Sequence, residues 1–164
     1  MEESKRITLL HLLEGNARLT HEQLAEMLGE TPEAVAAAMA DLEARKVIVQ
    51  HSAIIDWDKT GSDRVTALIE VKLTPQRDVG FDRLARRIAR FAEVRSCYLM
   101  SGLYDLTVEV EAASLKEVAR FVSERLSTLE GVASTTTHFV LKRYKHDGIS
   151  FGDDQEDERL AVTP

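Results

Sequence analysis

The residues best suited to bind a small molecule lie in one stretch, Leu99-Met100-Ser101-Gly102-Leu103-Tyr104-Asp105-Leu106. It joins two strand-like runs through a single glycine, and Asp105 stands where the second run begins. A glycine lets the backbone approach a ligand closely, and amide groups in such a turn can hold a carboxylate. The side chain of Asp105 could pair with an ammonium group, and no structural task for it is evident. The turn is therefore a candidate site for a small polar ligand.

The other side chains suited to chemistry form no recognisable constellation. The sequence has no Gly-rich phosphate loop, no cluster of metal-ligand residues and no nucleophile elbow. The spacing of Ser, His and Asp suggests no triad, and the five histidines are scattered: His11, His21, His51, His138 and His146. We therefore predict no catalytic residues, no metal site and no cofactor.

Bulk properties restrict the class of protein. A chain of 164 residues holds one ordinary domain or two small ones, and 44% hydrophobic with 30% charged residues is normal for a soluble protein. No apolar run approaches the ~18 residues that span a bilayer, and the first residues lack the pattern of a signal peptide. Cys97 is the only cysteine, so no internal disulfide can form. We expect a cytoplasmic protein without membrane contact.

The first 45 residues carry three helical patterns. Apolar residues recur at helical spacing over residues 7–13, and Thr20 with Gln23 fits a capping box at the start of a second helix. After a Gly-containing turn, Thr31 can cap a third helix and Pro32 can take its first position. Three short helices with a tight turn before the third predict a helix-turn-helix, although a plain three-helix bundle fits the same periodicity.

A wing and a DNA-facing surface follow from this prediction. Two β-rich runs, residues 47–49 and 53–55, would form the wing. The outward face of the third helix lacks the Arg, Lys, Asn or Gln that make bidentate base contacts, so DNA binding would depend on phosphates and DNA shape. The candidate DNA contacts are Thr31, Glu33, Ala37, Arg45, Lys46, Gln50 and His51.

The second half of the chain predicts a βαββαβ domain. Strand-like alternation at residues 65–73, 94–101, 104–111 and 132–142 is interrupted by helical periods at 81–91 and 115–126. This order is the ferredoxin-like arrangement, in which both helices cover one face of the sheet. The other face needs a cover, and a second copy of the domain is the simplest one. We expect that open face to carry Ile69, Val71, Val108 and Val140.

Charge is unevenly distributed along the chain. Residues 1–60 have six Lys/Arg against eleven Asp/Glu, residues 61–146 have fourteen against eleven, and residues 147–164 have one against six. A DNA-binding segment is usually basic, so the acidic N-terminal part leaves open a sensor that acts through a protein partner. Four arginines of the helix at 81–91 lie opposite its apolar side and predict a solvated face, or a contact with DNA or an acidic partner: Arg83, Arg86, Arg87 and Arg90.

The order and spacing of these features, from about Ser4 to Lys145, resemble the leucine-responsive/asparagine regulator (Lrp/AsnC) family of transcription factors. The matching signatures are Leu24-Ala25, Leu42-Glu43 before Val47-Ile48, Ser101-Gly102-Leu103-Tyr104-Asp105, Leu129-Glu130-Gly131-Val132 and Thr135-Thr136-Thr137. The resemblance implies an α+β protein with an N-terminal winged helix-turn-helix followed by a ferredoxin-like βαββαβ regulatory domain. It also implies homodimers that assemble further, often to octamers, on double-stranded DNA, and an amino acid or related small effector bound between paired regulatory domains.

The resemblance also implies boundaries and site residues. We expect the DNA-binding domain at residues 1–56, a linker at 57–64 and the effector domain at 65–146. Outside the family's common pattern, we expect an acidic tail at 147–164, whose segment from Gly152 to Glu158 is mostly disordered and solvated. The implied effector site comprises Leu99, Ser101, Gly102, Tyr104, Asp105, Thr135, Thr137 and His138. Two positions depart from the family: Lys46 stands where a glycine is usual, and Ala37 and Met39 stand where the recognition helix usually has arginine.

The sequence thus predicts a transcriptional regulator, not an enzyme, whose assembly or DNA affinity responds to an amino acid or similar metabolite. One alternative is the effector sensor with a protein partner. Another is an enzyme resembling the siroheme decarboxylases, which share this two-domain layout but use clustered His and Arg that this sequence lacks.

Overall fold

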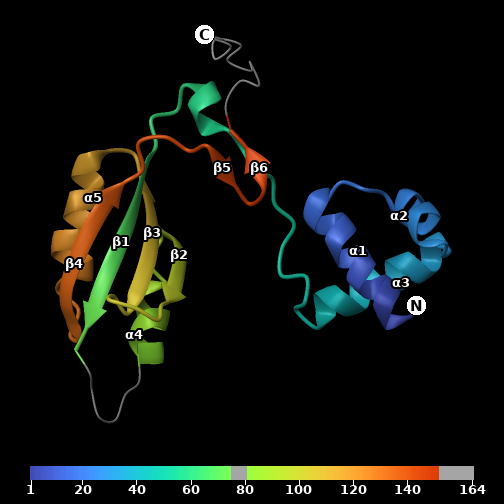
Figure 1. Ribbon diagram of the computed structural model, residues 1–164, viewed down its shortest axis with the longest axis horizontal. Coiled ribbons are helices and arrows are strands. Elements are labelled where there is room, and N and C mark those ends of the chain that lie inside the picture. Colours follow the sequence, from blue (N-terminus) through green and yellow to red (C-terminus); the bar gives the residue numbers. More distant parts are fainter. Residues whose placement is uncertain (75–80, 152–164) are drawn as a thin grey trace, which may run out of the picture. The chain divides into compact units, whose positions relative to one another are not determined.

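A computed structural model describes residues 1–74 and 81–151 (Figure 1). The chain divides after Ile55 into two compact units, and each has its own buried hydrophobic core. The first unit contains three helices: α1 (Glu3–Gly15), α2 (His21–Leu28) and α3 (Pro32–Ala44). The second contains η1 (Trp57–Thr60), β1 (Val65–Leu73), α4 (Phe81–Ile88), β2 (Val94–Leu99), β3 (Leu106–Ala112), α5 (Leu115–Phe121), η2 (Val122–Leu126), β4 (Val132–Phe139), β5 (Lys145–His146) and β6 (Ile149–Ser150).

Local hydrogen bonds define where the helices of the first unit begin. The backbone N–H of Gln23 donates to Oγ1 of Thr20 over 3.3 Å, and the N–H of Thr20 donates to Oε1 of Gln23 over 2.9 Å, which confirms the capping box. At α3, Oγ1 of Thr31 accepts from the N–H of Ala34. The apolar faces of the three helices meet in a core of Leu9, Leu13, Leu24, Ala25, Leu28, Val35, Ala38 and Leu42. The helix-turn-helix prediction is confirmed.

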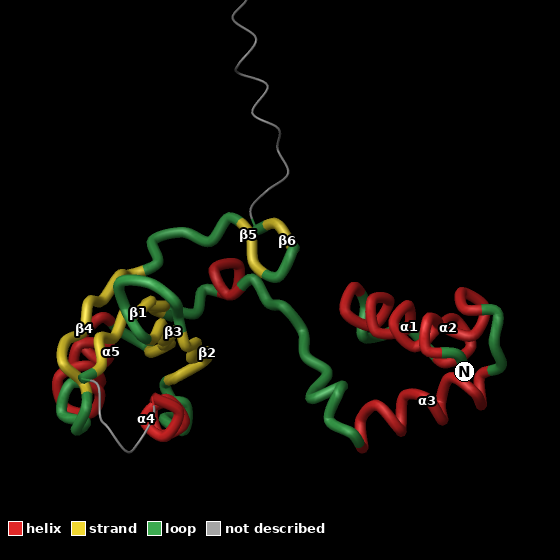
Figure 2. The backbone as a smooth tube through the Cα atoms, turned by 60° about the horizontal axis from the view of Figure 1, so that its bottom comes forward, coloured by secondary structure: helices red, strands yellow, loops and turns green. Residues whose placement is uncertain are grey.

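The predicted wing strands are absent. Residues 47–56 contain no strand, and Figure 2 draws the segment after α3 as loop. Ile48 packs against the helical core, but Val47, Val49, Ile54 and Ile55 are each more than 40% exposed. A two-stranded hairpin is marginally stable without a surface to pack on, and this unit provides none for those side chains. The β-branched composition of the two runs therefore does not produce strands here.

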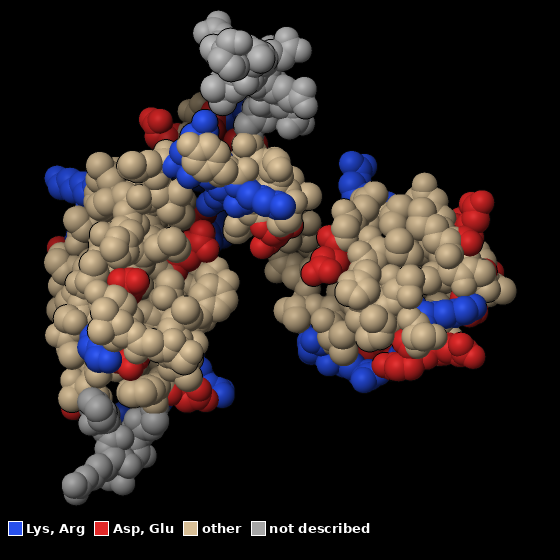
Figure 3. All heavy atoms as spheres, in the orientation of Figure 1, with Lys and Arg blue, Asp and Glu red and all other residues tan. Residues whose placement is uncertain are grey.

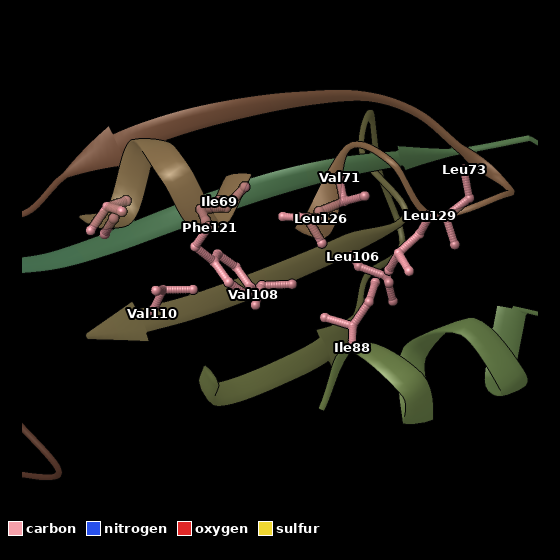
Figure 4. Close-up of a cluster of buried hydrophobic side chains, with 12 residues drawn as sticks. Ile69, Val71, Leu73, Ile88, Leu106, Val108, Val110, Phe121, Leu126 and Leu129 are labelled. Atoms are coloured by element: carbon pink, nitrogen blue, oxygen red, sulfur yellow. The ribbon is translucent and has the colours of Figure 1, made fainter. Parts of the chain in front are cut away.

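The second unit has the predicted ferredoxin-like topology. Its four-stranded sheet has the order β2-β3-β1-β4, with every neighbouring pair antiparallel. Figure 4 shows side chains such as Ile69, Val108 and Phe121 between the strands and the helical segments. Cys97 is half-buried against this core, and burial raises the pKa of its thiol, which keeps it protonated.

The open face of the sheet is not the one we predicted. Ile69, Val71 and Val108 have no exposed surface and belong to the core beneath the helices. Side chains alternate along a strand, so the opposite face carries the polar residues between them, such as Glu70 and Lys72. The apolar side of a one-sided sheet is the side that helices cover, so this prediction was wrong. Of the four predicted residues, only Val140 has more than a third of its surface exposed.

Element ends also differ from the prediction. The helix expected to reach residue 91 ends at Ile88, and the last strand of the sheet ends at Phe139 rather than at residue 142. The hairpin of β5 and β6 occupies residues 145–150, where we expected the acidic tail to begin. The acidic segment predicted to be disordered, residues 152–158, lies outside the described residues.

Candidate functional site

The turn between β2 and β3 is fixed at both ends by the sheet. The N–H of Met100 donates to the carbonyl of Asp105 over 2.9 Å, and the N–H of Asp105 donates to the carbonyl of Val71 over 3.1 Å. Asp105 therefore extends the ladders between β2 and β3 and between β1 and β3 by one residue. The segment between Met100 and Asp105 is left outside the ladder, with Ser101, Gly102 and Leu103 exposed to solvent.

The carboxylate of Asp105 has a structural task that the sequence did not reveal. Its Oδ2 accepts a hydrogen bond from the N–H of Leu73 over 2.7 Å, and Nζ of Lys72 lies 3.5 Å from the same oxygen. The side chain of Asp105 is 19% exposed, so both contacts are partly shielded from water. Among the described residues, Oδ1 of Asp105 receives no hydrogen bond. One oxygen of Asp105 therefore fastens the turn to β1.

Lys72 of β1 contacts the turn, and the sequence alone did not predict this contact. Its ammonium group donates to the carbonyl of Leu103 over 3.0 Å and also pairs with Asp105. Val71 lies opposite Leu106 in the sheet, which places Lys72 opposite Asp105 on the open face. Only the register of two strands more than 30 residues apart brings Lys72 to the turn. The alternation of β1 indicated an outward polar side chain there and nothing more.

Gly102 is not required by the fold of the turn itself. Its φ does not lie in the left-handed region, and a Cβ atom added to it would meet no atom within 4 Å. The local fold thus accepts a side chain at this position. Gly102 keeps the space beside the exposed turn open. It stands three residues before Asp105, whose carboxylate is partly shielded from water.

The eight predicted effector residues lie in two groups. Leu99 pairs with Leu106, Leu106 with Val71, and Val71 with Thr135, so one row crosses the whole sheet from β2 to β4. Strands lie ~4.8 Å apart, so Leu99 and Thr135 are roughly 14 Å apart in one copy. The group near the turn is Leu99, Ser101, Gly102, Tyr104 and Asp105, and the group on β4 is Thr135, Thr137 and His138.

The group on β4 is itself divided between the two faces of the sheet. Oγ1 of Thr135 lies 3.4 Å from Oγ of Ser127 on the helix-covered side, and Thr137 shares that side. His138 points to the open side, where Nε2 lies 3.3 Å from Oε2 of Glu70. A single copy therefore does not gather the predicted effector residues into one pocket.

The predicted DNA contacts begin at Thr31, the N-cap of α3, and continue along the helix and into the loop after it, and the outward surface of that helix is short of cations. Glu33 and Ala37 are exposed on the helix, and Gln50 is exposed in the loop after it. Arg45 lies 3.4 Å from Asp41, and His51 lies 3.2 Å from Glu43. Figure 3 shows acidic and basic side chains interspersed over this unit. This surface offers phosphate contacts but few side chains that read bases.

Asp41 is held by two cations. Hydrogen bonds from Arg6 and then from Arg45 lower the pKa of its carboxyl below the ordinary value. Arg6 belongs to α1, so this pair ties the first helix to the third. Asp41 therefore both supports the helical unit and partly neutralises Arg45 at the C-terminal end of α3.

Lys46 has a backbone conformation that favours glycine. Its φ is +58°, in the left-handed region, and it directly follows Arg45 at the end of α3. The N–H of Val47 donates to the carbonyl of Leu42, and the N–H of Lys46 donates to the carbonyl of Glu43. These two bonds form a Schellman motif, in which glycine is the usual residue at this position. The family's usual glycine thus coincides with a structural requirement that this chain meets with lysine.

Two family models match the chain. The Lrp/AsnC ligand binding domain matches residues 66–149, and a Crp-like helix-turn-helix domain matches residues 7–59. In the described residues, no helix is long and apolar enough to cross a membrane, and no group of three or more His, Cys, Asp or Glu side chains could hold a metal ion.

Curated relatives resemble the chain over most of its length. The HTH-type transcriptional regulator YugG of Bacillus subtilis is 51% identical over 98% of this chain and 97% of its own length. The leucine-responsive regulatory protein of Haemophilus influenzae is 23% identical over 85% of this chain and 83% of its own. Both are transcriptional regulators, so the decarboxylase alternative finds no support.

Solved structures share the fold. AsnC of E. coli superposes with a TM-score of 0.69 at 21% identity, covering 89% of this chain and 96% of AsnC. A transcriptional regulator from Neisseria meningitidis in complex with L-Met superposes with a TM-score of 0.70 at 24% identity, covering 93% and 97% of the two chains. The chain belongs to the Lrp/AsnC family and is a DNA-binding transcriptional regulator with a ligand-binding domain.

Proposed function

We propose that an amino acid binds at the turn of residues 101–105 and changes the DNA affinity or the assembly of this regulator. The observation that carries the proposal is the carboxylate of Asp105. Its Oδ2 is held by Leu73 and Lys72, and its Oδ1 has no partner in the described part of the chain. The turn also lies inside the segment matched by the ligand-binding family model.

The two charged groups of an amino acid match the two kinds of polar group at the turn. The ammonium group would pair with Oδ1 of Asp105, and the carboxylate would accept hydrogen bonds from amides exposed beside Gly102. Lys72 keeps Asp105 in place and adds a positive charge on the carboxylate side. The regulator from Neisseria meningitidis, whose structure contains L-Met, supports an amino acid as the class of effector.

We further propose that a second copy completes the effector site. The turn and the β4 group lie at opposite edges of the sheet, and His138 is the member of the β4 group on the open side, so His138 of one copy would meet the turn of another. The open face carries exposed apolar side chains suited to pairing, among them Leu68, Tyr98 and Val140, between charged neighbours. The proposed minimal assembly is therefore a homodimer, and the proposed larger assembly is an octamer.

Pairing through the open face has a direct test. Light scattering at micromolar concentration should show no stable monomer for the natural sequence and a shift toward monomer for Leu68→Glu. The control is Leu115→Glu, because Leu115 is an exposed leucine at the start of α5 rather than on the sheet. A monomeric natural protein would contradict the proposed assembly, and so would equal behaviour of the two variants.

DNA binding would depend on phosphate contacts near the end of α3. Arg45, Lys46, Gln50 and His51 provide donors there, and Thr31, Glu33 and Ala37 line the approach. Because Arg45 and His51 are already paired with acids, we expect modest affinity that falls steeply with salt. We also propose a cytoplasmic location, which DNA binding and the single cysteine both favour.

Calorimetry with a panel of amino acids that includes L-Met tests the effector site. Gly102→Ala adds a methyl group where the fold leaves open space, so the protein should stay folded while amino-acid binding weakens tenfold or more. The matched control is Gly15→Ala, another glycine with ordinary φ and open surroundings, which should bind as the natural protein does. Equal affinity in both variants would remove the turn from the site.

A further inference from the structure

A hollow lies near the end of β1, and none of the predicted effector residues lines it. It has a volume of about 380 Å³, which falls in the range of small-molecule sites. One wall is the exposed face of α4 and the turn that follows it, which contribute Arg83, Arg86, Arg87 and Arg90. The opposite side comes from the end of β1 and from the approach to β4.

The four arginines form one stripe along the helix. Arg83, Arg87 and Arg90 are spaced four and three residues apart, and backbone hydrogen bonds from Ala89 to Ala85 and from Arg90 to Arg87 continue the helical turn past Ile88. Arg86 lies 3.1 Å from Asp82 and is partly neutralised. The other three have no ion pair with any residue that the structure describes. Such a concentration of like charge on one helix face creates a positive potential that attracts anions.

The hollow also has apolar walls. Phe81 and Leu84 are half-buried and line it beside the arginines, and Leu73 lines it from the sheet. Glu130 is the one acidic residue among the lining side chains in the described part of the chain. The mixture of guanidinium groups and apolar surface suits a compact ligand with several negative charges better than it suits solvent.

We propose that this hollow binds a small organic polyanion carrying two or more phosphate or carboxylate groups. A guanidinium group binds a phosphate or carboxylate bidentately, and the stripe presents several guanidinium groups at successive helical turns. The concave shape and the apolar walls favour a small molecule over the phosphate backbone of DNA. The site is also linked to the turn, because Leu73 is among the residues that line the hollow and its N–H donates to Asp105.

Titration calorimetry at low salt, with pyrophosphate and citrate as separate probes, tests the site on the full chain. The double substitution Arg83→Gln with Arg87→Gln removes two exposed charges from the stripe. The control is Lys116→Gln with Arg120→Gln, which removes two exposed charges from α5. We expect at least one probe to bind the natural protein, the α4 variant to bind it at least tenfold more weakly, and the control to match the natural protein within twofold. The stronger probe identifies phosphate or carboxylate as the preferred group.

Two outcomes would overturn the proposal. The first is binding of neither probe by the natural protein, or equal binding by the natural protein and the α4 variant. The second is that the α4 variant binds DNA more weakly while the control does not, and that the α4 variant still binds the probes normally. The arginine stripe would then be a surface for DNA phosphates. Thermal unfolding of both variants confirms that they fold.

Discussion

The carboxylate of Asp105 and the backbone N–H of Leu73 are joined by a hydrogen bond of 2.7 Å that spans two neighbouring strands. Leu73 lies at the shift in register between β1 and β4, where the regular ladder of the sheet is interrupted. The bond therefore satisfies a backbone donor at a weak point of the sheet. It also orients a carboxylate beside a turn that is otherwise open to solvent.

Substitutions at Asp105 should separate its structural role from its binding role. Asp105→Asn keeps an oxygen for Leu73 and removes the charge, so the free energy of unfolding should fall by no more than ~1 kcal/mol, as for a weak ion pair. Asp105→Ala also removes the acceptor, and the fall should be ~1–3 kcal/mol. Both variants should bind amino acids tenfold or more weakly. Denaturant unfolding and calorimetry measure the two effects, and unchanged binding by Asp105→Asn would contradict the ammonium contact.

The left-handed conformation of Lys46 should carry a cost in stability. Lys46→Gly should raise the free energy of unfolding of the helical unit by about 1 kcal/mol, because glycine adopts positive φ without strain. Lys46→Ala removes the same side-chain charge but keeps a Cβ atom, so it serves as the control and should not stabilise. Urea unfolding followed by far-UV circular dichroism compares them. Equal stability of the two variants would show that φ is not the cause.

Arg45 and Lys46 should contribute to DNA binding through phosphates. The double change to Ala should weaken binding to all sequences by about the same factor, and the slope of log affinity against log salt should become shallower by up to ~1.8. Because Arg45 is paired with Asp41, Arg45 should contribute less to DNA affinity than Lys46 does. Altered sequence preference with unchanged overall affinity would show that these residues read bases.

Acid should weaken the helical unit through Asp41. Contacts with Arg6 and Arg45 lower the pKa of Asp41 in the folded state, so the stabilisation is present above the ordinary Asp pKa of about 3.9 and is lost as pH falls through the lower, folded value. The Asp41→Asn variant should lose less stability than the natural protein between about pH 5 and pH 2. Parallel pH dependence in the two proteins would contradict this assignment.

Local interactions were predictable from sequence, and long-range ones were not. The capping box of Thr20 and Gln23 lies within four residues, so its hydrogen bonds follow from residue types alone. The bond between Asp105 and Leu73 depends on the register of strands 32 residues apart, and the residues next to Asp105 in the chain do not predict it. The covered face of the sheet was predictable in principle, because Ile69 and Val71 alternate with polar residues. The prediction of wing strands was wrong because β-branched residues favour strands only where a surface packs against them.

The DNA affinity of the natural protein, measured at fixed salt with each amino acid in turn, tests the proposed regulation most directly. At least one amino acid should change the affinity, and the change should disappear in Gly102→Ala but persist in Gly15→Ala. If no amino acid changes the DNA affinity or the assembly, or if the response survives in Gly102→Ala, the turn of residues 101–105 is not the effector site.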